Sequence, residues 1–292
     1  MPLSIIAIST LIIGFTGLVW SANVFVSGSA SLAKHLGMTP ILIGLTVVAF
    51  GTSAPEMFVS AEAALDGVPN LAIGNAIGSN IANIGLVLGV TAIIAAIPIN
   101  TLLMRLEIPL LLIATFLAVF FLWDLHLSVL EGIGLLIAAI LATLLLIWDA
   151  RRPKSISSTE LAERAIPPEL NHLKAIIYVV MGLLALLGFA DLLVWSAKTL
   201  AEHLGVSPMI IGLTIVAVGT SLPELAASIA SALKGHHDIA IGNIIGSNLL
   251  NILAVMAIPG ILSSPSLTAM TVNRDLFVMV LLTLTLVATI GL

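Results

Sequence analysis

Long apolar runs, separated by short polar stretches, follow one another along almost the whole chain. At roughly 20 residues per membrane span, they predict nine transmembrane helices. The predicted ranges are 3–32, 40–64, 70–96, 105–123, 127–149, 173–201, 208–232, 238–262 and 274–292. The one clearly polar segment, 150–172, carries charges and three prolines, which is typical of a solvated connector between two halves.

The composition agrees with this pattern and excludes a soluble domain. Hydrophobic residues make up 60% of the 292 residues and charged residues 9%, with a mean hydropathy of +1.22. These values are typical of an all-α integral membrane protein whose solvent is the lipid bilayer. The absence of cysteine excludes a disulfide framework, a cysteine-ligated metal and a thiol nucleophile.

Lysine and arginine are distributed unequally over the two sides of the predicted helices. One side has Lys34, Arg105, Arg151, Arg152, Lys154, Arg164, Lys174 and Lys234, and the other has only Lys198 and Arg274. The positive-inside rule makes the first side cytoplasmic. We therefore expect the N-terminus outside and the 150–172 connector in the cytoplasm. The first apolar run has no basic residue before Lys34, so it predicts a retained helix and not a signal peptide.

Two segments of the chain recur at a constant shift of 168 residues. "HLGMTPILIGLTVVAFGTSAPE" (35–56) returns as "HLGVSPMIIGLTIVAVGTSLPE" (203–224), and "NLAIGNAIGSNIAN" (70–83) returns as "DIAIGNIIGSNLLN" (238–251). Five predicted helices precede the second half, so corresponding helices cross the membrane in opposite directions. Such inverted repeats are typical of secondary transporters, which place their substrate site near the bilayer midplane at the repeat interface.

The first repeated motif predicts a broken helix beside a carboxylate. Pro55 and Pro223 lack a backbone N–H and clash with the carbonyl four residues earlier, so each helix should break close to its glutamate. Backbone carbonyls near the break then need partners, which a bound cation would supply. In both copies Thr, Glu and Ser recur four residues apart on one helix face: Thr52, Glu56, Ser60 and Thr220, Glu224, Ser228. Hydroxyl, carbonyl and carboxylate oxygens are the ligands that hard cations such as Ca²⁺ prefer.

The second repeated motif predicts a polar stripe beside a close helix contact. Small residues four apart allow two helix backbones to approach each other: Gly74 and Gly78, then Gly242 and Gly246. Amides and hydroxyls also recur four apart: Asn75, Ser79, Asn83 and Asn243, Ser247, Asn251. These polar side chains either face the glutamates as ion ligands or hydrogen-bond neighbouring helices.

The two glutamates are costly in a membrane interior. A charged carboxylate at mid-bilayer costs about 2.5–3.5 kcal/mol on insertion scales, and such residues mark ion pathways or proton relays. Glu56 and Glu224 occupy equivalent repeat positions, which favours a shared ion site. The alternative is a pair of protonated acids hydrogen-bonded in the core.

The paired "GTSAPE" and "GTSLPE", each followed by "GNAIGSNIAN" or "GNIIGSNLLN", resemble the two alpha-repeats of the calcium/cation antiporter superfamily, in its sodium/calcium exchanger branch. The resemblance implies an inverted-repeat fold of ten helices, in which the first and sixth slide past a core built from the others. It divides the chain into an N-terminal repeat at 1–149 with its alpha-repeat at 35–83, the connector, and a C-terminal repeat at 173–292 with its alpha-repeat at 203–251. With nine helices predicted, we expect two five-helix halves with the last helix missing.

The resemblance also implies an ion site. Glu56 and Glu224 would carry a shared Ca²⁺/Na⁺ site with the carbonyls of Thr52 and Thr220. The sodium sites would be completed by Ser53, Ser221, Ser79, Ser247, Asn83 and Asn251. Position 251 departs from similar prokaryotic exchangers, which often carry Asp there. The short connector leaves no room for the calcium-sensing domains of animal exchangers, so a minimal prokaryotic-type transporter in the cell (inner) membrane is implied.

Three functional hypotheses follow. The first is a secondary active antiporter that exchanges Ca²⁺ for Na⁺ by alternating access, with no cofactor and no nucleic-acid or protein partner. The second keeps the transporter but makes H⁺ the counter-ion, because two close carboxylates can share a proton. The third is an intramembrane enzyme with paired glutamates, which is disfavoured because the Thr, Ser and Asn oxygens around both acids suit ion coordination.

Overall fold

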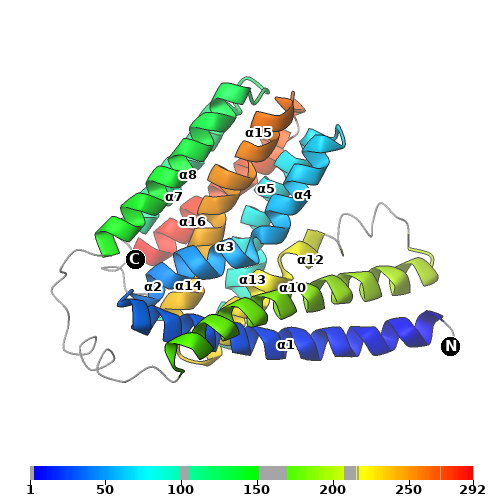
Figure 1. The fold of residues 1–292 in the computed structure, drawn as a ribbon. Coiled ribbons are helices and arrows are strands. Elements are labelled where there is room, and N and C mark those ends of the chain that lie inside the picture. The colour runs from blue at the N-terminus through cyan, green and yellow to red at the C-terminus, as the bar shows by residue number, and fades with distance from the viewer. Residues whose placement is uncertain are drawn as a thin grey trace.

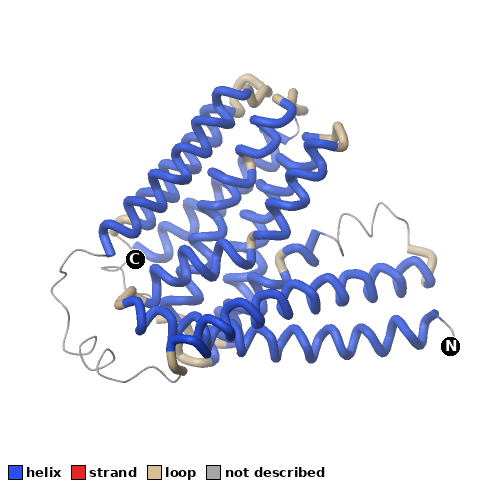
Figure 2. Tube along the Cα trace, viewed as in Figure 1, coloured by secondary structure: helices blue, strands red, loops and turns tan. Residues whose placement is uncertain are grey.

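The computed structural model describes residues 3–98, 105–150, 170–206, 215, 217–269 and 271–291. All regular elements among them are helices (Figures 1 and 2). The first half contains α1 (Leu3–Leu36), α2 (Pro40–Ile43), η1 (Gly44–Val48), α3 (Ala49–Thr52), α4 (Ala54–Leu65), α5 (Pro69–Ala82), η2 (Asn83–Leu88), α6 (Gly89–Ile94), α7 (Glu107–Phe121) and α8 (Val129–Ala150). The second contains α10 (His172–His203), α12 (Ala217–Thr220), α13 (Leu222–Leu233), α14 (His237–Leu250), η5 (Asn251–Val255), α15 (Ala257–Ser263), η6 (Thr271–Leu276) and α16 (Phe277–Gly291).

The helices confirm an all-α protein with several membrane spans. Among the described residues, six helices are long and apolar enough to cross a membrane, or seven if the bent pair Pro40–Thr52 and Ala54–Leu65 is one span. Glu107–Phe121 and Leu222–Leu233 are shorter apolar helices. The helix predicted over 208–232 can be followed from Ala217 onward, and its earlier part, apart from Ile215, lies outside the described residues. The same is true of most of the 150–172 connector.

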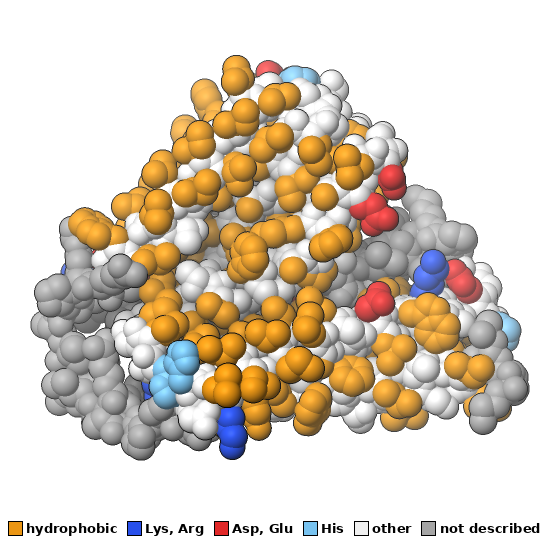
Figure 3. Space-filling model, in the orientation of Figure 1, with side chains coloured by type: hydrophobic (Ala, Val, Ile, Leu, Met, Phe, Trp, Pro, Cys, Tyr) orange, Lys and Arg blue, Asp and Glu red, His pale blue; other side chains and the backbone are white. Residues whose placement is uncertain are grey.

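Apolar side chains cover much of the visible surface (Figure 3). Exposed examples include Ile93, Leu130, Phe58 and Trp123, each more than three-quarters accessible. A soluble protein rarely exposes large contiguous apolar surface. The surface is therefore suited to lipid.

The molecule has two parts, the helix pair α1/α10 and a bundle of the remaining helices. The long helices α1 and α10 lie side by side and antiparallel, across one end of the remaining bundle (Figure 1). The span His237–Ser263, which contains α14, η5 and α15, is the most enclosed of the described spans: 78% of its apolar stretch is buried, against 22–39% for the others. The α1/α10 pair shares a buried apolar cluster with Ile43, Ala227 and Ile239, so it packs on the elements that bear both repeated motifs.

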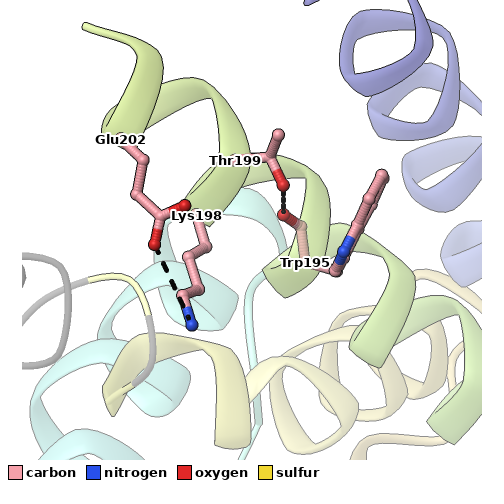
Figure 4. A network of polar contacts seen from close by, with 4 residues as sticks. All are labelled: Trp195, Lys198, Thr199 and Glu202. Carbon is pink, nitrogen blue, oxygen red and sulfur yellow. Dashed lines mark hydrogen bonds and ion pairs between the residues drawn. The ribbon is translucent and has the colours of Figure 1, made fainter. Parts of the chain in front are cut away.

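The end of α10 carries a short run of polar contacts (Figure 4). Lys198 and Glu202 form an exposed ion pair at 4.0 Å, and the Thr199 hydroxyl donates to the Trp195 carbonyl at 2.8 Å. All of these contacts are within one helix turn. The ion pair offsets the charge of Lys198, which is one of the two basic residues that the positive-inside rule places outside.

The predicted helix breaks are present in both halves. Ser53, with φ −84° and ψ 6°, separates α3 from α4, and Ser221, with φ −89° and ψ 2°, separates α12 from α13. A proline stands in the first two positions of each following helix, where its missing N–H costs nothing. The two parts of the first broken helix are bent by 43°.

Wide π-helical turns begin at two of the predicted ion ligands. Turn η2 starts at Asn83 and turn η5 at Asn251, and these positions are equivalent in the repeats. A π-turn inserts one extra residue per turn and often occurs at functional sites. In each repeat the polar stripe therefore ends where the helix changes to a wider turn.

The close helix contact predicted for the second half is confirmed. A Cβ added at Gly242 would lie 2.5 Å from the Ile41 carbonyl oxygen, and one at Gly246 would lie 2.6 Å from the Leu45 carbonyl oxygen. At Gly74 and Gly78 an added Cβ meets nothing within 4 Å among the described residues. Residues 212 and 213, the repeat counterparts of Gly44 and Leu45, lie outside the described ranges.

This close contact predicts a cost for adding one methyl group at Gly242. Gly242→Ala should destabilise the protein by about 1–3 kcal/mol, because the contacting atoms are backbone and overpacking forces them apart. Gly134→Ala is the control and should be tolerated, because an added Cβ there lies 3.7 Å from Phe121 Cζ, which is an ordinary van der Waals distance. Thermal unfolding of both purified variants in detergent measures the effect, and equal melting temperatures would refute the packing argument.

Candidate ion-binding site

The two helix breaks place a buried glutamate at the start of each following helix. Glu56 lies in the first turn of α4 and Glu224 in the first turn of α13, and each is 1% exposed. Unpaired backbone N–H groups give the first turn of a helix a partial positive charge. The break thus lowers the cost of a carboxylate that lies far from water.

A hydrogen bond joins the two repeats at these breaks. The Ser53 hydroxyl, in the first half, donates to Glu224 Oε1, in the second half, at 3.1 Å. Glu224 also lies within electrostatic reach of Glu56. The carboxylates therefore share one location at the interface between the halves.

Asn243 supports this location, and both the oxygen and the nitrogen of its amide are hydrogen-bonded to protein groups. Its Oδ1 accepts from the Thr52 hydroxyl at 3.1 Å, and its Nδ2 donates to Ser228 Oγ at 3.0 Å and to the Glu224 carbonyl at 3.4 Å. Among the two interpretations of the stripe, this residue follows the helix-packing one. Its repeat counterpart Asn75 has no partner for Nδ2 among the described residues.

Several predicted ligands keep a buried oxygen without a hydrogen-bond partner among the described residues. These oxygens are Glu56 Oε2, Asn83 Oδ1, Ser221 Oγ, Glu224 Oε2, Ser247 Oγ and Asn251 Oδ1. Buried polar atoms are normally paired, and leaving one unpaired costs about 1–3 kcal/mol. A cation that accepts several oxygens at once would compensate this cost.

The structure also describes the other predicted ligands. Thr52 and Ser53 are fully buried and use their hydroxyls in the contacts above, and Ser79 is 5% exposed on α5. Thr220 is half-buried at the end of α12. Their roles as ion ligands stay predictions.

Two buried asparagines lie outside the predicted polar stripe, which contains residues spaced four apart. Asn80 and Asn248 are each 1% exposed, and Asn248 accepts a hydrogen bond from Asn83 Nδ2 at 3.4 Å. The repeated "GSN" in both halves is the signal that could have found them.

Three other acids of the apolar segments lie on the surface. Glu62, Asp66 and Asp191 are exposed. In the part of the chain that the structure describes, no group of three or more His, Cys, Asp or Glu side chains could hold a metal. The candidate site therefore has two carboxylates surrounded by neutral oxygens.

Known proteins are similar to this chain in sequence. The sequence model of the family described as "Sodium/calcium exchanger protein" matches residues 6–148 and 174–292. The putative antiporter CaxA of Alkalimonas amylolytica is 43% identical over 97% of this chain and 89% of its own length. The sodium/calcium exchanger MaX1 of Methanosarcina acetivorans is 30% identical over 94% of this chain and 89% of its own.

A solved structure is similar over almost the full fold. The sodium-calcium exchanger NCX_Mj, soaked with 10 mM Na⁺ and zero Ca²⁺, superposes with a TM-score of 0.85 at 32% identity. The match covers 99% of this chain and 92% of that one.

The bracing role of Asn243 predicts a loss of stability on truncation. Asn243→Leu removes the hydrogen bonds to the Thr52 hydroxyl, to Ser228 Oγ and to the Glu224 carbonyl, so we expect a destabilisation of about 1–3 kcal/mol. Asn75→Leu, at the equivalent position, is the control and should cost less, since its Nδ2 has no partner to lose among the described residues. Thermal unfolding in ion-free detergent solution measures both variants. An equal loss in the two would show that the brace does not stabilise this half in particular.

Proposed function

This chain belongs to the sodium/calcium exchanger protein family, and from that premise we propose that it exchanges Ca²⁺ for Na⁺ across the membrane by alternating access. The resemblance drawn from the repeated motifs is confirmed, and the protein is a multi-pass membrane transporter for cation/Ca²⁺ antiport, not an enzyme. The identity of the counter-ion is our proposal.

The observation that carries the proposal is the contact between the halves at the paired carboxylates. Ser53 of one repeat binds Glu224 of the other, and Glu56 and Glu224 each keep a buried oxygen without a partner among the described residues. A substrate cation held there would contact both repeats. A relative movement of the repeats would then change the side from which the ion is reached.

We assign the ion site to the ten residues that the repeats relate in pairs. They are Thr52 and Thr220, Ser53 and Ser221, Glu56 and Glu224, Ser79 and Ser247, and Asn83 and Asn251. The glutamates supply charge, the threonines supply backbone carbonyls at the breaks, and the serines and asparagines supply neutral oxygens. Such a set suits Ca²⁺ and Na⁺, which take oxygen ligands in variable number.

The charge of this set explains why exchange would be obligatory. With two glutamates and an asparagine at 251, the ionised site carries a charge of −2, which one Ca²⁺ or two Na⁺ would neutralise. An unneutralised pair of carboxylates would cross a dry barrier at high cost. The loaded site therefore changes sides more easily than the empty one.

Proton coupling is the competing proposal. Glu224 lies within electrostatic reach of Glu56, and two such carboxylates can share a proton, which would also reduce the charge of the site. An imposed Na⁺ gradient and an imposed pH gradient distinguish between the two possible counter-ions.

The test is uptake of radioactive Ca²⁺ into proteoliposomes. An outward Na⁺ gradient should drive uptake, and a pH gradient without Na⁺ should not. The reverse result would assign the counter-ion to H⁺.

Glu56→Gln and Glu224→Gln should each reduce uptake to the level of protein-free liposomes, because each removes half of the charge while the shape is kept. Glu62→Gln, an exposed acid on the same helix as Glu56, is the matched control and should transport normally. Wild-type uptake in either site variant would refute the site.

We further propose that the protein lies in the cell (inner) membrane with its N-terminus outside and the 150–172 connector in the cytoplasm. The charge distribution over the loops supports this orientation. The halves at 1–149 and 173–292 would be the two moving repeats.

A cysteine at position 157 tests the orientation, because the chain has no cysteine of its own. Ser157 lies in the connector, outside the described residues. Ser157→Cys should react with a membrane-impermeant maleimide in inside-out vesicles and stay unlabelled in intact cells. Labelling of intact cells would reverse the topology.

A further inference from the structure

Asn80 and Asn248 occupy equivalent positions in the two repeats, three residues before Asn83 and Asn251. All four side chains are 1% exposed. The repeat symmetry predicts two matching hydrogen bonds between the halves. One would run from Asn83 to Asn248, and the other from Asn251 to Asn80.

The first of these bonds is present. Asn83 Nδ2 donates to Asn248 Oδ1 at 3.4 Å. Because the amide nitrogen is turned toward Asn248, the Asn83 oxygen faces away from it. That oxygen is buried and has no partner among the described residues.

The second bond is absent among the described residues. Asn80 Nδ2 instead donates to the Met279 sulfur at 3.4 Å, and Asn80 Oδ1, which would accept from Asn251, has no partner. Asn251 therefore lacks the support that Asn83 has.

The residue that Asn80 contacts differs between the two repeats. Met279 on α16 corresponds to Leu111 on α7, and both are at most 1% exposed. Helix α16 packs against α5 just as α7 packs against α14. A thioether is a weak hydrogen-bond acceptor, and leucine has no acceptor. Asn80 thus finds a partner on α16, whereas Asn248 finds none on α7 and accepts from Asn83.

We propose that Asn248 is a positioning residue that holds the Asn83 oxygen toward the ion, and that Met279 withholds the same support from Asn251. Asn83 is then a preset ligand and Asn251 an adaptable one. This inference rests on the proposed function, in which Asn83 and Asn251 contact the ion.

A double-mutant cycle tests the role of Asn248. Asn248→Leu should raise the apparent KM for Ca²⁺ about three- to tenfold, as expected for loss of one buried hydrogen bond, with a smaller change in maximal rate. In an Asn83→Ala background the same substitution should have no further effect on KM. An equal rise in both backgrounds, or no rise in either, would overturn the proposal.

The exchange of Met279 and Leu111 gives a second test with side chains of similar volume. Met279→Leu should release Asn80 to accept from Asn251 and lower the KM for Ca²⁺ about threefold. Leu111→Met should draw Asn248 toward α7 and raise it by a similar factor. If both substitutions shifted the KM for Ca²⁺ in the same direction, or if neither shifted it, the proposed asymmetry would be contradicted.

The ion site and the positioning role of Asn248 can be refuted separately. Wild-type uptake in Glu56→Gln would refute the proposed site itself. Loss of uptake in Glu56→Gln together with additive, uncoupled effects of Asn83 and Asn248 would leave the site intact and refute only the positioning role.

Discussion

The structure depends on the cost of holding two carboxylates away from water. Glu56 and Glu224 are almost completely buried in a bundle whose outer surface is apolar, and an isolated charge in such surroundings is expensive. Two features reduce that cost: a helix start behind each glutamate, and a hydroxyl donated from the opposite repeat to Glu224. The buried oxygens without a partner among the described residues add to the cost, and a bound cation would compensate it. Stability of the fold and ion binding therefore use the same groups.

The helices are interrupted where this arrangement needs it. Ser53 and Ser221 break two helices directly before the glutamates, and Asn83 and Asn251 begin wide turns in two others. Irregular backbone is tolerated in a membrane protein where it is enclosed by protein or lines a cavity. Close packing of Gly242 and Gly246 on the backbone of α2 and η1 provides that enclosure on one side.

The two halves are related in sequence but do not make the same contacts. Asn243 uses both ends of its amide on protein groups, while Asn75 Nδ2 has no partner among the described residues, and Asn80 and Asn248 have different partners. We attribute the second difference to Met279 against Leu111, because a buried amide takes an acceptor that lies within reach.

The sequence by itself determined the membrane class, the inverted repeat, the helix breaks and the family. Each of these depends on local chemistry: apolar length, a constant shift between two motifs, and prolines that cannot continue a helix. The position of Glu56 and Glu224 in a first helix turn also followed from Pro55 and Pro223. Only the tertiary structure decided which polar side chains are spent on packing. Asn243 and Asn83 belong to similar stripes, yet one uses its whole amide on protein and the other keeps a buried oxygen without a partner among the described residues. That choice depends on side chains supplied by distant helices, such as Thr52 for Asn243 and Asn248 for Asn83, and spacing along one helix contains no information about them.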